Sequence, residues 1–291
     1  MKVALCAIAR HENKYLKEWI EHYKNMNVDH IILGDNNNEL DDEDIATFIN
    51  DNGYSDYVTV INKKRKEGEL FTVDSQIAFY NEVYKRYNDQ YDWIMFFDID
   101  EFMQICPNFC ENDIHSYIKI SLTNAKHNYN IEADQLFVGW MIYGDNNNIF
   151  YEDKPVQERF TEITDQIYLS QFNNLVYTGK CILRTNCPAK FTTTMHNACG
   201  IDNYSLITIS SGGCVWNNYT YEVSPFYHND AFLKHYFTKS LEEFIQRKID
   251  NNNSHYISFD NIVENYFRIN KKTLEKTKVA ELYRKICVEN E

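Results

Sequence analysis

The sequence lacks any hydrophobic run long enough to cross a membrane as a helix. Its opening stretch, MKVALCAIARHE, has only a short apolar run. The charged residues Arg10 and Glu12 follow it where a signal peptide would carry a small-residue cleavage site. We therefore expect a cytoplasmic protein in which residues 3–9 form a buried strand.

Basic residues are scarce: 29 Lys and Arg stand against 43 Asp and Glu, which gives a formal net charge of −14. A chain of this charge repels the phosphate backbone, which argues against a polymeric nucleic acid as a partner. A small anionic ligand would need a local cation, or a metal ion held by carboxylates.

Paired cysteine motifs, internal repeats and low-complexity linkers are also missing. The nearest of the eight cysteines, Cys106 and Cys110, are separated by three residues without a matching second pair, which excludes zinc-ribbon and CxxC redox patterns. We expect reduced, mostly buried thiols. The length alone suggests one large domain or two small ones. We favour one domain, 1–250, followed by a C-terminal helical appendage, 251–291.

The first hundred residues alternate between strand and helix patterns. Apolar runs predict strands at 3–9, 30–35, 57–62 and 91–105, and helical spacing of apolar residues predicts helices at 13–24 and 73–87. Strands that alternate with helices run parallel through right-handed crossovers. Residues 1–105 therefore predict an open, mainly parallel, twisted α/β sheet with helices on both faces.

The pattern becomes less regular after residue 106. Short strand-like pieces stand at 133–143, 180–185 and 205–211. Gly, Asn and aromatic residues crowd between them, which indicates an antiparallel region with long loops that close over a ligand. Ser240 and Glu243 form the capping box of a late helix. The basic tail, 261–287, predicts either a helix hairpin packed on the domain or a face that touches anionic lipid at the inner side of the membrane.

The stretch YDWIMFFDIDEFMQI ends an apolar run with Asp98, Asp100 and Glu101. Side chains alternate along a strand, so we expect Asp98 and Asp100 on one side, with Cα atoms roughly 6–7 Å apart. Ligands of open α/β sheets bind beyond the carboxyl ends of the strands. The two carboxylates can therefore hold a divalent cation, Mn²⁺ or Mg²⁺, that bridges the oxygens of a diphosphate. The alternative is that the acids only solvate the end of the strand.

Three separated stretches resemble one family. FFDIDEF resembles the metal-binding DxD segment of nucleotide-sugar glycosyltransferases with the GT-A fold. CAIARHENKYLKEWIEHYKNMNVDHIILGDNN and LKHYFTKSLEEFIQRK are similar to the first and late segments of the family-2-like group that includes glycosyltransferase family 92. The resemblance implies a GT-A-like fold in which 1–105 is the nucleotide-binding half and 106–250 the acceptor-side half.

The resemblance also implies a nucleoside pocket at the ends of the first two strands. It would be lined by Ala9, Arg10, Glu12, Asp35 and Asn36. A carboxylate such as Asp35 can accept a hydrogen bond from a base imide or a ribose hydroxyl. Gln76 corresponds to a position that faces the nucleotide in this group. The alternative for Arg10 and Glu12 is a solvated ion pair or an acid at a helix start.

His235 lies a few residues before the capped helix, whose N-terminus favours phosphate. We expect His235 to be the third metal ligand beside Asp98 and Asp100, with Lys239 near the diphosphate. Asp98 serves either the metal, a metal-bound water or the ribose, and Glu101 has a supporting or structural role. The other reading of His235 is a structural histidine.

The sequence gives fewer signals for the residues that bind and activate the acceptor. An inverting transferase needs a carboxylate base that takes the proton of the acceptor hydroxyl. Asp145, in WMIYGDNNN, is the first candidate for that base or for acceptor binding, and Glu158, in QERF, is the second. The alternatives are a turn aspartate for Asp145 and an ion pair with Arg159 for Glu158.

We expect a metal-dependent glycosyltransferase that moves a hexose from a nucleotide-diphosphate donor, a UDP-hexose first of all, to a glycan or lipid-linked glycan acceptor. Inversion and a place in surface polysaccharide biosynthesis are part of this expectation. One alternative is a haloacid-dehalogenase-type phosphatase, which also carries DxD after a strand, although there it follows the first strand. The other is a non-catalytic glycan-binding or assembly protein.

Overall fold

The computed structural model describes residues 1–39, 44–66, 72–164, 178–210, 215–217, 229–250 and 266 of the chain. The described part forms two compact units, Met1–Trp140 with Leu175–Lys234, and Met141–Asn174 with His235–Glu291. The predicted appendage, 251–291, lies outside the described residues except for Tyr266, and so does the basic tail. The division of the chain at residue 250 stays a prediction.

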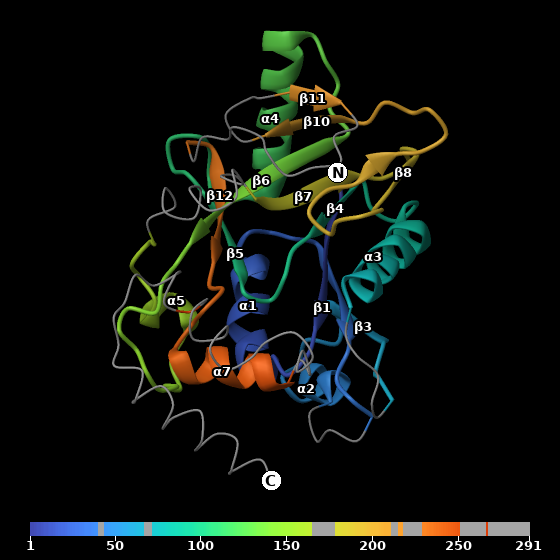
Figure 1. Cartoon of the computed structure of the whole chain (residues 1–291). Coiled ribbons are helices and arrows are strands. Elements are labelled where there is room, and N and C mark those ends of the chain that lie inside the picture. Colours follow the sequence, from blue (N-terminus) through green and yellow to red (C-terminus); the bar gives the residue numbers. More distant parts are fainter. Residues whose placement is uncertain are drawn as a thin grey trace. The chain divides into compact units, whose positions relative to one another are not determined.

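The first unit contains a large mixed sheet (Figure 1). Its parallel strands are β1 (Val3–Ala9), β2 (His30–Asp35), β3 (Val58–Asn62) and β4 (Trp93–Phe96). It continues through β7 (Gly179–Arg184), β6 (Gln135–Ile142), β10 (Ile207–Ser210) and β11 (Val215–Asn217) in the order β11-β10-β6-β7-β4-β1-β2-β3. Strand β7 is antiparallel to both β4 and β6, whereas β10 and β6 are parallel. The predicted α/β class, with a mainly parallel open sheet, is confirmed, and the arrangement is consistent with a GT-A-like fold.

The described helices of the first unit are α1 (Asn13–Asn25), α2 (Ile45–Asp51), α3 (Val73–Tyr87) and α4 (Ile114–Tyr129). Helices α1 and α3 agree with the predicted amphipathic helices, whereas α2 was not predicted. Helix α1 buries Leu16, Trp19 and Ile20. A two-stranded sheet of β8 (Ala189–Lys190) and β9 (Cys199–Gly200) lies in the same unit. The described cysteines are free thiols, and most of them are buried.

Helix α3 packs on the sheet through aromatic side chains. Phe79 and Tyr80 belong to one apolar cluster with residues of β1, β2, β4 and β7. A Cβ atom on Gly34 would lie 2.8 Å from the ring of Phe79, which is closer than carbon atoms approach. Glycine at this point of β2 therefore lets the helix lie close to the sheet.

The prediction of one strand over 91–105 is wrong. Strand β4 ends at Phe96, a turn follows, and β5 (Glu101–Ile105) pairs with β12 (Ala231–His235) instead of continuing along β4. Asp98 and Asp100 explain the break, because charged side chains are costly in the interior of a buried strand. Asp98 and Asp100 consequently lie in a turn, and the strand alternation expected for them does not apply.

Helix α4 was not predicted, although its ends carry clear signals. The side chain of Asp113 accepts a hydrogen bond from the backbone N–H of Ser116 at 2.7 Å, as an N-cap residue does. Asn130 ends the helix in a left-handed conformation with φ of 53°. The weak apolar face of 114–129 hid the helix from periodicity alone.

The second unit contains α5 (Val156–Arg159) and α7 (Leu241–Asp250). The predicted capping box of α7 is confirmed. Ser240 N–H donates to Glu243 Oε2 at 3.1 Å, and Glu243 N–H donates to Ser240 Oγ at 3.2 Å. Glu243 also forms a bidentate ion pair with Arg159, at 2.8 and 3.0 Å, so one carboxylate ties α5 to the start of α7.

Candidate active site

The turn between β4 and β5 is held by hydrogen bonds at both ends. The N–H of Asp98 donates to Glu101 Oε2 at 2.9 Å, and the N–H of Glu101 donates to the carbonyl of Asp98 at 3.1 Å. The indole N–H of Trp19 on α1 reaches the carbonyls of both residues at 3.1 Å, and the hydroxyl of Tyr23 donates to the carbonyl of Glu101 at 2.9 Å. The acidic turn is therefore anchored to a buried helix.

Asp98 is fixed from two elements of the first unit. Its Oδ1 accepts from Gln76 Nε2 at 2.8 Å and from Tyr80 Oη at 3.1 Å, both on α3. Its Oδ2 forms an ion pair with Lys180 Nζ of β7 at 2.8 Å. Burial, followed by the charge of Asp98, raises the pKa of the Tyr80 hydroxyl, which keeps it protonated as a donor.

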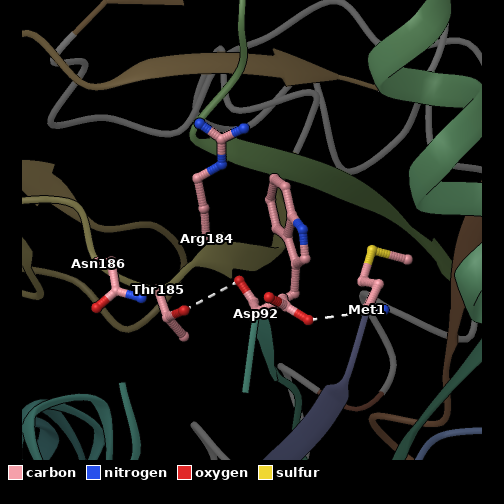
Figure 2. Close-up of a pocket in the computed structure, with 6 residues that line it drawn as sticks. Met1, Asp92, Arg184, Thr185 and Asn186 are labelled. Carbon is pink, nitrogen blue, oxygen red and sulfur yellow. Dashed lines mark hydrogen bonds and ion pairs between the residues drawn. The ribbon is translucent and has the colours of Figure 1, made fainter. Parts of the chain in front are cut away.

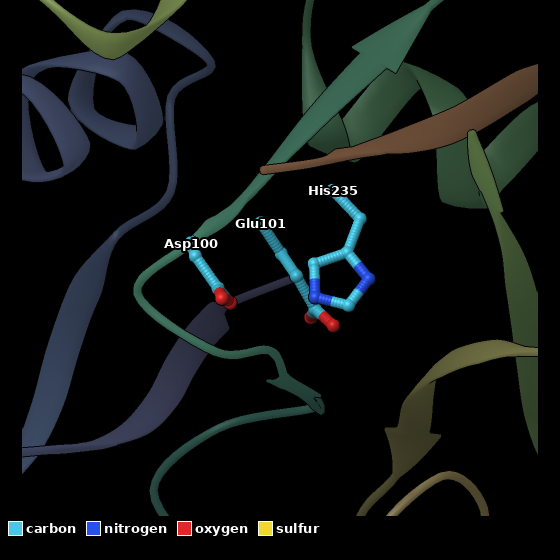
Figure 3. Close-up of side chains that lie close together, drawn as sticks. All are labelled: Asp100, Glu101 and His235. Carbon is cyan, nitrogen blue, oxygen red and sulfur yellow. The ribbon is translucent and has the colours of Figure 1, made fainter. Parts of the chain in front are cut away.

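A candidate metal centre is formed by Asp100, Glu101 and His235 (Figure 3). Each residue offers one ligand atom, and these atoms lie within 4.8 Å of one another. His235 is the last residue of β12, which pairs with β5, and Figure 3 shows its ring turned toward the two carboxylates. The three residues are 7, 0 and 5% exposed. Two carboxylates and an imidazole are suitable ligands for a divalent cation.

The negative charge of Glu101 is disfavoured by the burial of its side chain. Burial raises the pKa of its carboxyl well above the usual range, and the charges of Asp98 and Asp100 add to this effect, while the Lys180 ammonium opposes it. Its Oε1 has no hydrogen-bond partner among the residues that the structure describes. A cation bound beside it would satisfy both the charge and the unpaired oxygen.

The ends of β1 and β2 come together, as the prediction of a nucleoside pocket requires. Ala9 and Asp35 are in register, and the N–H of Asn36 donates to the carbonyl of Ala9 at 2.9 Å. Asp35 is 2% exposed, and its two oxygens accept from the N–H groups of Asn37 and Ile45 at 3.1 and 3.4 Å. Burial raises the pKa of Asp35, against the effect of these hydrogen bonds. The carboxylate therefore shapes the loop after β2.

Arg10 and Glu12 follow β1 directly, and both are half-buried. Glu12 is the N-cap residue of α1, but its side chain makes no capping hydrogen bond. A role of these two residues toward a nucleotide stays a prediction, as does that of the other residues proposed for this pocket.

A model of glycosyltransferase family 92 matches residues 2–281. The chain belongs to glycosyltransferase family 92. It is therefore a glycosyltransferase, and both the phosphatase and the non-catalytic alternatives are set aside. The family implies a sugar donor and a glycan acceptor.

Other comparisons add little to this assignment. The crystal structure of S. aureus TarS 1-349 is similar with a TM-score of 0.32 and 10% identity, over 52% of this chain and 39% of that chain. A second structure of S. aureus TarS gives a TM-score of 0.33 and 12% identity, over 52% of this chain and 24% of that one. Likeness at this level does not bear on what the family 92 chain does. No curated protein matches the sequence.

The remaining predicted residues belong to the second unit of the family 92 chain. Asp145 is 3% exposed and accepts from the N–H of Asn147 at 3.0 Å and from the hydroxyl of Tyr266. Glu158 is exposed on α5, and its neighbour Arg159 pairs with Glu243. Lys239 is buried, with φ of 52°, directly before the cap of α7. Their roles stay predictions.

Sequence reasoning missed Lys180 and gave Glu101 only a supporting role. Lys180 is 0% exposed within the apolar strand β7, between Gly179 and Cys181. A lysine inside an apolar strand is itself a signal, because such a residue needs a buried partner. Glu101 carried a similar signal, since Phe102 and Met103 follow it in a buried strand.

A separate hollow of about 540 Å³ lies where β4 begins and β7 ends (Figure 2). It is lined by Met1, Asp92, Trp93, Arg184, Thr185 and Asn186. Strand β4 begins there, whereas the acidic turn follows its end. Thr185 Oγ1 donates to the carbonyl of Asp92 at 3.1 Å, and the ring of Trp93 is buried, so these groups are engaged within the protein.

None of the described helices has the length and apolar character needed to cross a membrane.

Proposed function

We propose that this family 92 enzyme transfers a hexose from a nucleotide-diphosphate sugar, with UDP as the nucleotide, in a reaction that requires Mn²⁺ or Mg²⁺. The acceptor is a glycan or a lipid-linked glycan, and the pathway is surface polysaccharide assembly on the cytoplasmic side. The observation that carries the metal requirement is the buried cluster of Asp100, Glu101 and His235. Three ionisable side chains in so little space are costly without a cation.

The cluster fits a divalent cation in three respects. Its ligands are carboxylate oxygens and an imidazole nitrogen, the donor set that Mn²⁺ accepts. Glu101 Oε1 lacks a hydrogen-bond partner among the described residues, and its pKa is raised by burial. When bound, the cation would neutralise charge on the diphosphate leaving group.

The protein residues around the cluster have separable tasks in this proposal. The ends of β1 and β2 hold the nucleoside, with Asp35 shaping the loop and Asn36 fixed to Ala9. Gln76 acts through Asp98, because its amide donates to that carboxylate. Lys239, next to the N-terminus of α7, lies near the diphosphate.

For the acceptor we propose direct displacement with inversion at the anomeric carbon. A carboxylate takes the proton of the attacking hydroxyl, with Asp145 or Glu158 as the base. Asp145 would receive that proton on a carboxylate that already accepts from Tyr266. Glu158 offers an exposed carboxylate on α5.

A thermal-shift titration with UDP, with and without Mn²⁺, tests this proposal. We expect UDP to raise the melting temperature only when Mn²⁺ is present. The variant Asp100→Asn should lose this response, because it removes one charged ligand from a cluster of three. A panel of nucleotide sugars screened for slow hydrolysis then identifies the donor.

Asp89→Asn is the matched control, since it removes the same charge from an exposed position on the surface. It should respond to UDP and Mn²⁺ as the wild type does. A folded wild-type protein that no nucleotide stabilises would refute the nucleotide-sugar donor. Stabilisation by UDP that persists in EDTA would refute the metal requirement.

A further inference from the structure

Lys180 is a buried cation beside the proposed metal centre. Strand β7 pairs with β4 so that Cys181 lies opposite Phe96. Because the two strands are antiparallel, the preceding residue of β7, Lys180, lies beside Phe97, the first residue after β4. Its ammonium therefore reaches the acidic turn. The side chain is 0% exposed and forms its ion pair with Asp98 Oδ2 at 2.8 Å. A lysine this deeply buried is retained only where a charge is needed or well paired.

The ion pair uses most of the capacity of the Asp98 carboxylate. A carboxylate accepts about four hydrogen bonds, two at each oxygen. Oδ1 already receives two donors, from Gln76 and Tyr80, and Oδ2 lies 2.8 Å from the Lys180 ammonium in the ion pair. The Asp98 side chain is 32% exposed, so Oδ2 can still accept a hydrogen bond from a hydroxyl or a water molecule. Chelation of a cation by both oxygens would instead require Asp98 to leave Gln76, Tyr80 and Lys180.

The charges of the turn support the same division of tasks. Burial lowers the pKa of Lys180, but the negative charges of Asp98, Glu101 and Asp100 raise it further, so the lysine keeps its proton. With all three acids ionised, one lysine leaves a formal charge of −2, which one divalent cation balances. Without the lysine, the three acids and one divalent cation would carry a net negative charge, and Asp98 Oδ2 would lose its ion-pair partner.

We propose that Lys180 is a positioning residue that supplies a fixed positive charge to the acidic turn and keeps Asp98 out of the coordination shell of the cation. The inference rests on the proposed function for the cation itself. It assigns the cation to Asp100, Glu101 and His235, and Asp98 to a hydroxyl or a cation-bound water.

The test is a titration of the folded protein with Mn²⁺, in which electron paramagnetic resonance measures the free and bound Mn²⁺. This measurement needs no sugar donor. Lys180→Met removes the charge and keeps an unbranched side chain that is one atom shorter. We expect this variant to bind Mn²⁺ at least tenfold more tightly, because a repelling charge is gone and Asp98 is released toward the cation. Donor hydrolysis should fall at least tenfold in the same variant, because Asp98 has left its position.

A merely structural lysine would give weaker Mn²⁺ binding and lower activity together. Opposite changes in the two readouts therefore distinguish positioning from damage. Lys180→Arg keeps the charge and should retain wild-type affinity for Mn²⁺. In the double variant Asp98→Asn/Lys180→Met the gain in affinity should vanish, because the released carboxylate is no longer there.

Lys190→Met is the control, since Lys190 is exposed on β8 and its loss should leave both readouts unchanged. If Lys180→Met does not fold, Asp98→Asn decides: its loss of Mn²⁺ affinity should be at least tenfold smaller than that of Asp100→Asn. Equal losses, or a Lys180→Met that behaves as Lys190→Met, would overturn the inference alone. A wild-type protein that binds neither Mn²⁺ nor UDP would overturn the proposed function as well.

Discussion

His22 on α1 shows how the surroundings of one side chain set its chemistry. Its ring packs edge-on against Tyr23 and Phe102, and Nε2 lies 2.9 Å from the carbonyl of Met103. That contact requires the tautomer with hydrogen on Nε2. Burial, followed by the charge of Lys234, lowers the pKa of His22 to about 4, against the hydrogen bond to Met103. The imidazole is therefore neutral in the folded protein at neutral pH.

This pKa predicts a loss of stability in mild acid. The unfolded chain binds a proton at His22 below its usual pKa near 6.5, whereas the folded protein does so only near 4. Between these values the unfolded state binds more protons, so stability falls with falling pH, by about 1–2 kcal/mol between pH 6.5 and 5. The variant His22→Gln should lose this slope in urea unfolding.

The exposed His127 on α4 supplies the comparison. His127→Gln should show the pH dependence of the wild type. If both variants keep the same slope as the wild type, His22 is not the group that titrates.

Gly34 is a second residue whose neighbours determine its identity. A methyl group at this position would meet the ring of Phe79. We expect Gly34→Ala to destabilise the protein by about 1–3 kcal/mol, as overpacked core substitutions do. Adding Phe79→Leu should recover part of the loss, which chemical denaturation of the single and double variants would measure. No recovery would mean that the backbone, and not the ring, is the obstacle.

At the scale of the elements, α5 and α7 are joined by a buried ion pair. Arg159 and Glu243 are each about 3% exposed at the side chain, and Glu243 also closes the capping box with Ser240. Removing one member leaves the other charge buried without its partner. We therefore expect Arg159→Met to destabilise the second unit by about 3–5 kcal/mol, measured by chemical denaturation.

The chain offers a matched surface pair for this experiment. Lys154 and Glu152 form an ion pair at 2.9 Å with both side chains exposed. Lys154→Met should have no measurable effect, because water already solvates both charges. If the free energy of unfolding falls by a similar amount in the two variants, burial does not make the Arg159–Glu243 pair more important for stability than the exposed pair.

At the scale of the whole molecule, a cation at the proposed centre should stabilise the fold. Mn²⁺ at 100 times its dissociation constant would raise the free energy of unfolding by about 2.7 kcal/mol. Glu101→Gln should abolish this gain. It should also make the metal-free protein more stable than the wild type, because the raised pKa of Glu101 shows that its charge is costly in the fold.

Thermal melts in Mn²⁺ and in EDTA would measure both effects. Glu111→Gln, at an exposed position, should keep the metal response of the wild type. A Glu101→Gln protein that is less stable than the wild type in EDTA would contradict the assigned cost of the charge.

Local patterns were enough for most of residues 1–105. Strands 3–9 and 30–35 and the helix at 73–87 agree with the structure, because each has a continuous apolar run or a clear helical face. The helix at 114–129 and the break after Phe96 were missed, because neither changes the local periodicity. Their signals are the cap residues Asp113 and Asn130 and the acidic residues after Phe96, which a search for periodicity does not register.

The same limit applies to the site. Asp100 and His235 could be named from short motifs, and the structure brings them together. Lys180 could not be assigned to Asp98, because only the antiparallel pairing of β7 with β4 brings them together. The place of Glu101 in the cluster also depends on a turn that Trp19 and Tyr23 hold by hydrogen bonds from helix α1.

The pairing of β5 with β12 has a consequence for the order of folding. Asp100 and His235 come from segments that are far apart in the sequence, so a long loop must close before their side chains meet. A cation has no complete site in the unfolded chain or in an early intermediate. We therefore expect Mn²⁺ to slow unfolding while leaving the refolding rate unchanged. The stabilisation by Mn²⁺ would then lie entirely in a lower unfolding rate of the native state.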